Sequence, residues 1–330
     1  MEVKMKFTLA ENDITDLQSY LILIRVIRPD EKITRLAKAG EGNMNLTLRA
    51  ELGDKSLIVK QANPFVQKYP SIAAPVERAE MEYAFFKRAN AIEQISQYLP
   101  APVFHDAENH LQVIEDLGTQ GDYSRFYNTE LDLPTEVISE LTGFLKLLHE
   151  STRGGEVVEN QKMRELNHTH IFDFPFNPES GFNLDDIQEG LQALANKLVL
   201  NNPELRKIAA DLGKTYLSTK GPSLLHGDFF PGSWLDSADG IKIIDPEFCF
   251  TGPVEFELGV FQAHLHFCGM SIDRIHSSLR PYPDFDQNLT DQFAGIEILR
   301  RLYGVAQLPL SRTISEKENL SLTALNLLNL

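Results

Sequence analysis

Leu225-His226-Gly227-Asp228 ends a short apolar run with an aspartate, and Ile244-Asp245-Pro246-Glu247-Phe248 does the same further along this 330-residue chain. A turn at Asp239-Gly240 separates the two runs, so we expect a small hairpin that brings Asp228 and Asp245 to one end. Phosphoryl transfer needs such a pair, because one carboxylate orients the attacking hydroxyl and another holds the magnesium that bridges the phosphates. Either aspartate alone is explained equally well as a turn residue. The two aspartates together favour a catalytic role in phosphoryl transfer over two separate turns.

A second set of candidate residues lies near the N-terminus. Gly40-Glu41-Gly42-Asn43-Met44-Asn45 is a glycine-containing loop ahead of a predicted strand, where backbone N–H groups can lie over phosphates. The alternation in Ser56–Lys60 points Lys60 inward. A lysine that faces inward needs an anionic partner. A nucleotide phosphate and a glutamate of the following helix, Glu80 or Glu82, would supply two.

Strand signals dominate the first third of the chain and helical periodicity the remainder, which predicts two lobes of an α+β fold. In the first lobe we expect a hairpin of residues 46–50 with 56–60 around Gly53-Asp54, and a second strand pair of residues 103–105 with 111–114. We also expect two helices there, at residues 12–27 and 75–90. Asp13 or Thr15 would cap the first helix. The second lobe carries helices at residues 137–149 and 296–303.

Composition narrows the classes of function. The chain has 31 basic and 47 acidic residues, a formal charge of −16, which opposes broad contact with nucleic acid or anionic lipid. Cys249 and Cys268 are the only cysteines, too few for a disulfide framework, so we expect a reduced, cytoplasmic protein. The apolar stretch Leu21–Ile27 is too short to span a bilayer.

Several segments, taken together, resemble the methylthioribose kinases within the wider aminoglycoside and choline phosphotransferase group. They are the loop from Gly40 to Asn45, Ile58–Pro64, Val113–Leu117, His226–Ser233 and Asp245–Phe248. The resemblance implies a protein-kinase-like two-lobed fold, with a small N-terminal antiparallel-sheet lobe (residues 1–116) and a larger, mainly helical C-terminal lobe (residues 117–330). It also implies a small-molecule kinase that uses ATP and Mg²⁺, with ATP between the lobes.

The resemblance further assigns roles. Asp228 would be the catalytic base, while Asp245 and Glu247 would bind the metal. Ser233 stands where many kinases place a metal-binding asparagine. Lys60 would hold the α- and β-phosphates, paired with Glu82.

Two more contacts follow from the same resemblance. Val113–Leu117 would be the hinge, with the backbone of Glu115 and Leu117 pairing with adenine. Arg300 and Arg301 resemble the arginine pair that contacts the sugar in methylthioribose kinases. From the residues alone, an exposed basic helix face is the simpler interpretation of that pair.

Other functions stay open on the sequence. The acceptor hydroxyl can belong to a methylthioribose-like sugar or to choline, an aminoglycoside, homoserine or a glycated amine. A nucleotide-binding pseudokinase that regulates a partner is a different class, which the retention of Lys60, Asp228 and Asp245 disfavours. A homodimer is the commonest default for an oligomer. The pairs His168/His170 and His264/His266 lack the spacing of a metal site.

Overall fold

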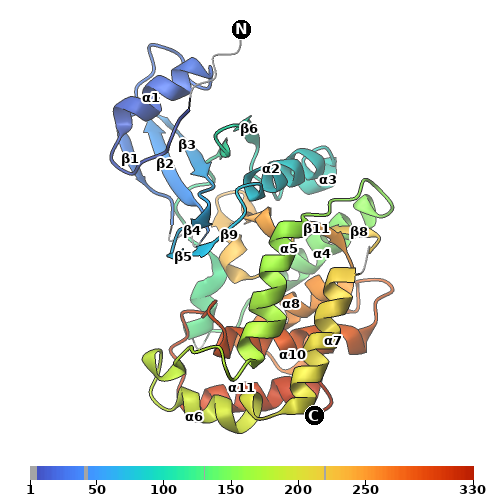
Figure 1. Cartoon of the computed structure of the whole chain (residues 1–330). Helices are drawn as coiled ribbons and strands as arrows, with labels where there is room; N and C mark the ends of the chain where they lie inside the picture. Colours follow the sequence, from blue (N-terminus) through green and yellow to red (C-terminus); the bar gives the residue numbers. More distant parts are fainter. Residues whose placement is uncertain (1–5, 41–43, 130, 219–220) are drawn as a thin grey trace. The chain divides into compact units, whose positions relative to one another are not determined.

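The computed structural model describes residues 6–40, 44–129, 131–218 and 221–330 (Figure 1). The chain folds into two compact units. One consists of Met1–Gln120 with Ser237–Phe248, the other of Gly121–Asp236 with Cys249–Leu330. The first holds an antiparallel sheet and the second is mainly helical, so the predicted α+β class is confirmed. The boundary expected between residues 116 and 117 stays a prediction.

The first unit is built on a five-stranded sheet of order β1-β2-β3-β7-β6, in which every neighbouring pair is antiparallel. Both predicted strand pairs are present. Gly53 has a φ of +73°, which glycine adopts without strain, and it lies in the turn that joins β2 to β3. The strands are β1 (Arg35–Lys38), β2 (Leu46–Leu52), β3 (Lys55–Gln61), β6 (Pro102–Asp106) and β7 (Leu111–Glu115).

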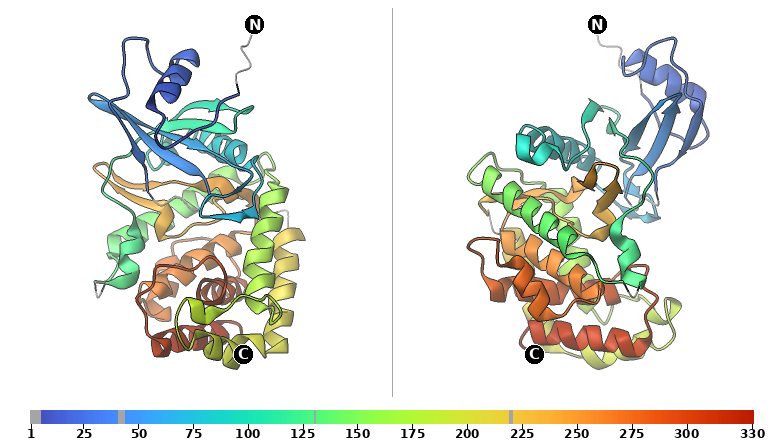
Figure 2. Two further views of the ribbon diagram at one scale, coloured as in Figure 1. Left: turned by 60° about the vertical axis from the view of Figure 1, so that its left-hand side comes forward. Right: turned by 180° about the vertical axis from the view of Figure 1, so that it is seen from behind.

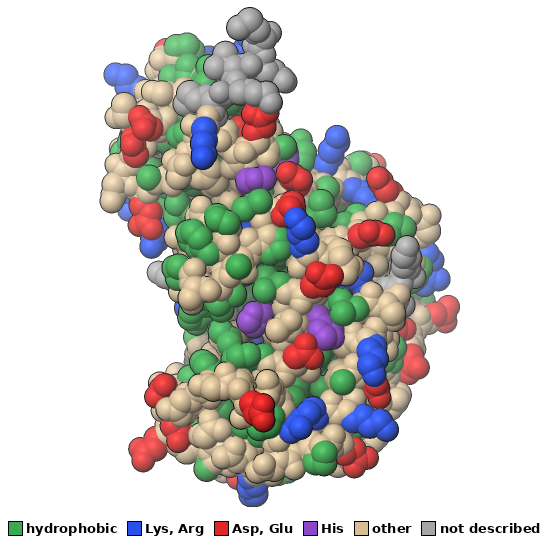
Figure 3. All heavy atoms as spheres, in the orientation of Figure 1, with side chains coloured by type: hydrophobic (Ala, Val, Ile, Leu, Met, Phe, Trp, Pro, Cys, Tyr) green, Lys and Arg blue, Asp and Glu red, His purple; other side chains and the backbone are tan. Residues whose placement is uncertain are grey.

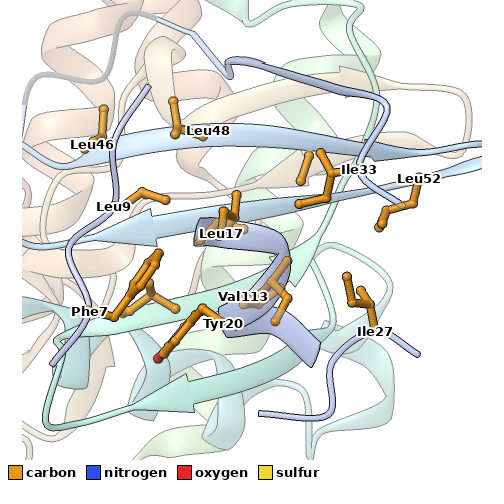
Figure 4. Close-up of a cluster of buried hydrophobic side chains, with 14 residues drawn as sticks. Phe7, Leu9, Leu17, Tyr20, Ile27, Ile33, Leu46, Leu48, Leu52 and Val113 are labelled. Atoms are coloured by element: carbon orange, nitrogen blue, oxygen red, sulfur yellow. The ribbon is translucent and has the colours of Figure 1, made fainter. Parts of the chain in front are cut away.

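Helix α1 (Ile14–Leu23) covers one face of this sheet. The side chain of Asp13 accepts a hydrogen bond from the backbone of Asp16 and caps the helix, as one of the two predicted caps. Figure 4 shows Leu17 and Tyr20 of the helix pointing at the strands, and Tyr20 stacks on Phe7 with ring centroids 4.0 Å apart. Alternate residues of β2 are buried here, which fixes the strand's register.

The opposite face of the sheet meets a different helix. Val59 of β3 belongs to the cluster under α1, so strand alternation turns its neighbour Lys60 to the other side. Helix α2 (Arg78–Ala89) packs there against β6 and β7, and it begins at Arg78 rather than at Pro75. The unit also contains α3 (Glu93–Ser96), β4 (Phe65–Val66), β5 (Tyr69–Ala73), β10 (Gly240–Ile243) and the 3₁₀ turn η7 (Pro246–Phe248).

Two buried helices form the centre of the second unit. Figure 2 shows α8 (Val254–Phe267) beside α10 (Gln287–Tyr303), with α11 (Ile314–Leu327) packed on α10. Nearly every residue of α8 is buried, including the polar residues Glu257 and His264. A Cβ atom at Gly259 would lie 2.9 Å from the carbonyl oxygen of Thr290, so this glycine permits the close approach of the two helices.

Further helices and strands complete the second unit. The remaining α-helices are α4 (Thr135–Thr152), α5 (Gln161–His168), α6 (Leu191–Ala195), α7 (Pro203–Ser218) and α9 (Ile272–Leu279). The 3₁₀ turns are η1 (Tyr123–Asn128), η3 (Phe174–Phe176), η4 (Leu184–Asp186) and η6 (Pro231–Ser233), the π-helical turns are η2 (Thr169–Asp173) and η5 (Asn196–Leu200), and the strands are β8 (Ser223–Leu225), β9 (Trp234–Ser237) and β11 (Phe250–Gly252).

The prediction that the two aspartate-bearing runs pair as a hairpin is wrong. Strand β8 pairs with β11, in a register that places Leu224 opposite Thr251, and not with residues 241–244. Pro231 opens a 3₁₀ turn soon after Asp228, and the chain turns there instead of continuing as a strand. The apolar alternation identified the strands correctly but carries no information on their partners.

Charged side chains are spread over the face of the helical unit that is visible in Figure 3. Figure 3 shows acidic and basic side chains interspersed over it, as the ordinary fraction of charged residues predicts. Among the described residues, none of the helices combines the length and the apolar character needed to cross a bilayer.

Candidate functional site

Lys60 is the centre of the site in the first unit. Only 4% of the residue is exposed, and its Nζ lies 2.6 Å from Oε1 of Glu82 and also contacts Oδ1 of Asp245. Burial alone would lower the pKa of Lys60, but the neighbouring carboxylates, Asp245 above all, raise it above its ordinary value. The lysine is therefore charged and fixed in place.

The structure distinguishes between the two candidate glutamates of helix α2. Glu82 lies on the buried face and is fully inaccessible, while Glu80 is partly exposed, 3.8 Å from the ring of His110. Burial raises the pKa of Glu82, and Lys60 opposes that rise. The expected contact of Lys60 with Glu82 is thus present, and its role toward phosphates stays a prediction.

Asp245 has an unusual backbone. Its φ is +61°, a left-handed conformation that costs free energy in a residue other than glycine and is common at functional sites. Its side chain is 46% exposed although Oδ1 contacts Lys60. Mg²⁺ binds to one or two carboxylates together with substrate phosphates, and an exposed carboxylate is suited to that role. Metal binding by Asp245 stays a prediction.

Glu247 has a different environment from Asp245. It is buried, and its Oε2 accepts a hydrogen bond from Nδ2 of Asn45 over 2.8 Å and lies 3.5 Å from Nε of Arg78. Burial raises the pKa of Glu247 to about 8. This oxygen is occupied by protein donors, and metal binding by Glu247 stays a prediction.

Arg78 joins this network to the loop ahead of β2. Its guanidinium donates to Oδ1 of Asn45 over 2.8 Å and to the carbonyl oxygens of Pro75 and Met44. Sequence reasoning missed this role of Arg78. The signal was its position one helical turn before Glu82, on the same face of α2.

The remaining nucleotide-binding candidates lie in the loop before β2 and at the end of β7. Gly40 has a φ of +99°, whereas Gly42 and Asn43 lie outside the described residues. The backbone N–H of Glu115 donates to the carbonyl oxygen of Ala101 over 2.9 Å. The adenine contacts of Glu115 and Leu117 stay predictions.

The second unit positions Asp228 through its backbone. The residue follows β8, and Gly227 before it has a φ of +89° that favours glycine. Glu257 of α8 accepts hydrogen bonds from the backbone N–H of Gly227 over 2.8 Å and of His226 over 3.1 Å. His149 lies 2.8 Å from the same carboxylate. Burial alone would raise the pKa of Glu257, but these hydrogen bonds and charges, led by His149, lower it.

Arg300 and Arg301 contact the side chain of Asp228. Nη2 of Arg301 lies 2.8 Å from Oδ1 of Asp228, and Nη2 of Arg300 lies 3.2 Å from the same oxygen. Both arginines are buried, so the interpretation as an exposed basic helix face is wrong. Contact with a sugar stays a prediction.

Glu297, one helical turn earlier on α10, holds both guanidinium groups. Its carboxylate lies 2.6 Å from Nε of Arg300 and 2.7 Å from Nε of Arg301. Burial alone would raise the pKa of Glu297, but the two arginines hold it well below its ordinary value. Sequence analysis overlooked this residue, although a glutamate three and four positions before two arginines is a signal of ion pairing.

A buried histidine extends the network away from Asp228. Nε2 of His264 is 3.2 Å from Glu297 and Nδ1 is 2.6 Å from the hydroxyl of Tyr127. Burial lowers the pKa of His264 to about 4, so the ring is neutral at pH 7. The carboxylate can only accept, which places the hydrogen on Nε2 and makes the tyrosine the donor to Nδ1.

Ser233 is buried within the loop that follows Asp228. Its oxygen lies 2.8 Å from the carbonyl oxygen of Phe230 and 3.1 Å from that of Asp228, either of which can accept its one hydrogen, and it accepts from the N–H of Phe230. In this arrangement the hydroxyl stabilises the loop. Metal binding by Ser233 stays a prediction.

A family model described as "Phosphotransferase enzyme family" (APH) matches residues 35–274, most of the chain, and this range contains Lys60, Asp228 and Asp245. The chain belongs to this family. A methylthioribose kinase from Exiguobacterium sibiricum is 29% identical over 266 residues, which cover 78% of this chain. The match spans 64% of that relative, so the chain covers less than two thirds of the relative's length.

Solved structures of phosphotransferases share the fold. A choline/ethanolamine kinase family protein from Mesorhizobium loti has a TM-score of 0.54 at 15% identity, covering 95% of this chain and 94% of its own. A spectinomycin phosphotransferase in complex with ADP and spectinomycin has a TM-score of 0.51 at 13% identity, covering 95% of this chain and 98% of its own. At this identity the likeness concerns the fold, and the predicted kinase-like architecture is confirmed.

Proposed function

We propose that the protein is an ATP-dependent small-molecule kinase that transfers the γ-phosphate to a hydroxyl of a methylthioribose-like sugar. The observation that carries the reaction is the ion pair between Lys60 on the third strand and Glu82 on the following helix, with Asp245 on the same lysine. Kinases of this architecture need such a lysine–glutamate pair to hold the nucleotide's phosphates. The ADP complex of the spectinomycin phosphotransferase also supports nucleotide use.

Each set of residues has a part in the proposed reaction. Lys60 binds the phosphates, and Asp228 orients the acceptor hydroxyl and takes its proton. Asp245 would hold Mg²⁺, which would neutralise charge on the transferring phosphoryl group. Mg²⁺ in nucleotide sites commonly takes further ligands from the phosphates and from water. The reaction requires both sets of residues to act on one nucleotide and its acceptor.

The surroundings of Asp228 favour a neutral acceptor over a cationic one. Two guanidinium groups lie within hydrogen-bonding distance of its carboxylate. A quaternary ammonium or aminoglycoside amine beside Asp228 would meet like charge, which is unfavourable in a partly buried site. A sugar hydroxyl meets no such repulsion. The similarity to methylthioribose kinases supports the same choice.

The test is ADP formation with Mg²⁺ across 5-methylthioribose, choline, homoserine, two pentoses and two aminoglycosides. The proposal expects the highest kcat/KM with methylthioribose, and only background with choline and the aminoglycosides. Preference for a cationic acceptor would retain the kinase and exclude the sugar. No turnover with any acceptor, despite calorimetric binding of ATP, would point to a pseudokinase.

A further inference from the structure

A pocket lies in the helical unit, between the residues that follow η4 and the segment that joins α10 to α11. Its volume is about 400 Å³, in the range of sites for small molecules. Arg300 and Arg301, which contact Asp228, are not among the residues that line it. The lining consists of Ile187, Gln188, Gln307, Leu308, Leu310, Ser311, Arg312, Thr313 and Lys317.

Lys317 is the unusual member of this lining. Only 4% of the residue is exposed. Within residues 6–40, 44–129, 131–218 and 221–330, no hydrogen bond or ion pair involves its Nζ, whereas the other buried lysine, Lys60, has two carboxylate partners. Burial lowers the pKa of Lys317, and no carboxylate opposes this effect. The side chain is thus largely buried while its ammonium group has no partner within these residues, so it can bind an anion from outside the chain.

The charges around Lys317 add to this demand. Nη2 of Arg312 binds the carbonyl oxygens of Tyr127 and Phe267, while its buried Nε has no hydrogen-bond partner among the described residues. The carboxylate near this guanidinium is Glu316, 3.4 Å from Nη1. Its other oxygen accepts two hydrogen bonds from Thr313 in the cap of α11. Lys317 and Arg312 thus bring two positive charges to the pocket, and the nearby carboxylate of Glu316 already binds Thr313 and Arg312.

We propose that this pocket binds a small metabolite with one oxyanionic group, a carboxylate or a phosphate, through Lys317. The ammonium group and Arg312 supply the positive charge. Gln188 and Gln307 also line this space, and their side-chain NH2 groups donate to backbone carbonyl oxygens. Leu308 and Leu310 provide apolar surface for the body of the ligand. This site is separate from the proposed catalytic residues and does not depend on their function.

The test measures the melting temperature of the full chain in inorganic phosphate, in acetate, and in sodium chloride of the same ionic strength. Wild-type protein is expected to gain thermal stability with phosphate, acetate or both, beyond the effect of sodium chloride. Phosphate alone, acetate alone, or both identifies the preferred anion. The absence of any specific gain in wild type overturns the proposal.

Variants show whether the anion binds at this pocket. Lys317→Met removes the charge at similar volume and is expected to weaken binding by about 10-fold or more, because a charged hydrogen bond is lost. Its melting temperature without anion stays equal to that of wild type or rises. Lys214→Met, at a lysine side chain that is 75% exposed, is the matched control and retains binding.

A third variant leaves the lysine unchanged. Ser311→Trp fills the pocket from its exposed rim and is also expected to abolish the gain. Equal responses to the anion in wild type, Lys317→Met and Ser311→Trp would place the anion elsewhere and overturn the proposal.

Discussion

Arg301 donates a hydrogen bond from Nη2 to Oδ1 of Asp228 over 2.8 Å. Arg300 reaches the same oxygen, so one atom of the carboxylate receives both guanidinium groups. A base that must accept a proton from a hydroxyl depends on its orientation, and these contacts fix the orientation of Asp228. The arginines are in turn held by Glu297, which makes this buried glutamate a support for the proposed base.

The first prediction concerns Arg301→Lys. Lysine retains the charge but lacks the planar fork that contacts Asp228 and Glu297 together, so kcat is expected to fall by about 10-fold or more while the protein stays folded. Steady-state kinetics with methylthioribose measures the change. Arg274→Lys is the control, since this arginine pairs with Asp132 at an exposed position. Unchanged kcat in Arg301→Lys would separate the arginine from the proposed base.

The second prediction concerns the buried pair of Lys60 and Glu82. Lys60→Met leaves Glu82 buried and without its partner, and is expected to lower the free energy of unfolding by about 3–5 kcal/mol. The double variant Lys60→Met/Glu82→Leu removes both charges and regains most of that loss. Urea unfolding measures both. Lys55→Met, at a half-exposed lysine, serves as the control.

Activity distinguishes the two Lys60 variants from the control Lys55→Met. Neither Lys60 variant is expected to turn over ATP, because the phosphates lose their lysine in both. A double variant as unstable as Lys60→Met would show that the interaction of the two charges is not what stabilises this part of the fold.

Local signals predicted much of the first unit. The turn at Gly53-Asp54 and the alternation through Lys60 are set by neighbours in sequence, and β2, β3 and the inward lysine follow from them. The partner of β8 did not follow, because β11 lies well beyond the turn that suggested the hairpin. A strand's apolar pattern shows that it is buried and leaves the choice of partner to the whole fold.

The sequence likewise indicated some residues of the candidate site and not others. Asp228 and Asp245 carry turn and strand-end signals of their own, so both stood out in the sequence. Glu257 and Glu297 lie within helices, where an acidic residue is ordinarily solvated, and their burial depends on the packing of α8 against α10. For Arg300 and Arg301 the family resemblance was the better guide, because burial cannot be determined from a basic pair alone.

The third prediction is a pH dependence of stability from Glu297. The two arginines hold its pKa below the ordinary value of about 4.3, so its contribution is complete above that pH and is lost as the pH falls below it. At pH 7, Glu297→Gln is expected to be less stable than wild type by about 3–5 kcal/mol, because Arg300 and Arg301 lose their buried partner.

Urea unfolding at pH 7, 5, 4 and 3.5 measures this difference. The gap between wild type and Glu297→Gln stays constant down to about pH 5 and narrows below about pH 4.3. Glu318→Gln, at an exposed ion pair with Lys197, is the control and shows a small gap at every pH. A gap that widens with acidification would contradict the ion-paired state of Glu297.

The central claim is that the protein transfers the γ-phosphoryl group of ATP to a sugar hydroxyl, with Asp228 as the base. The most direct test is ³¹P NMR of the protein with ATP, Mg²⁺ and 5-methylthioribose. Asp228→Asn retains the shape of the side chain but cannot accept the proton, and kcat is expected to fall by about 100-fold or more. Asp236→Asn, at a half-exposed aspartate beside Arg125, is the matched control. Wild type and Asp236→Asn are each predicted to form one sugar phosphate for every ADP, at similar rates. Asp228→Asn is predicted to form both products far more slowly. A folded Asp228→Asn protein that produces the sugar phosphate as fast as wild type would contradict the claim.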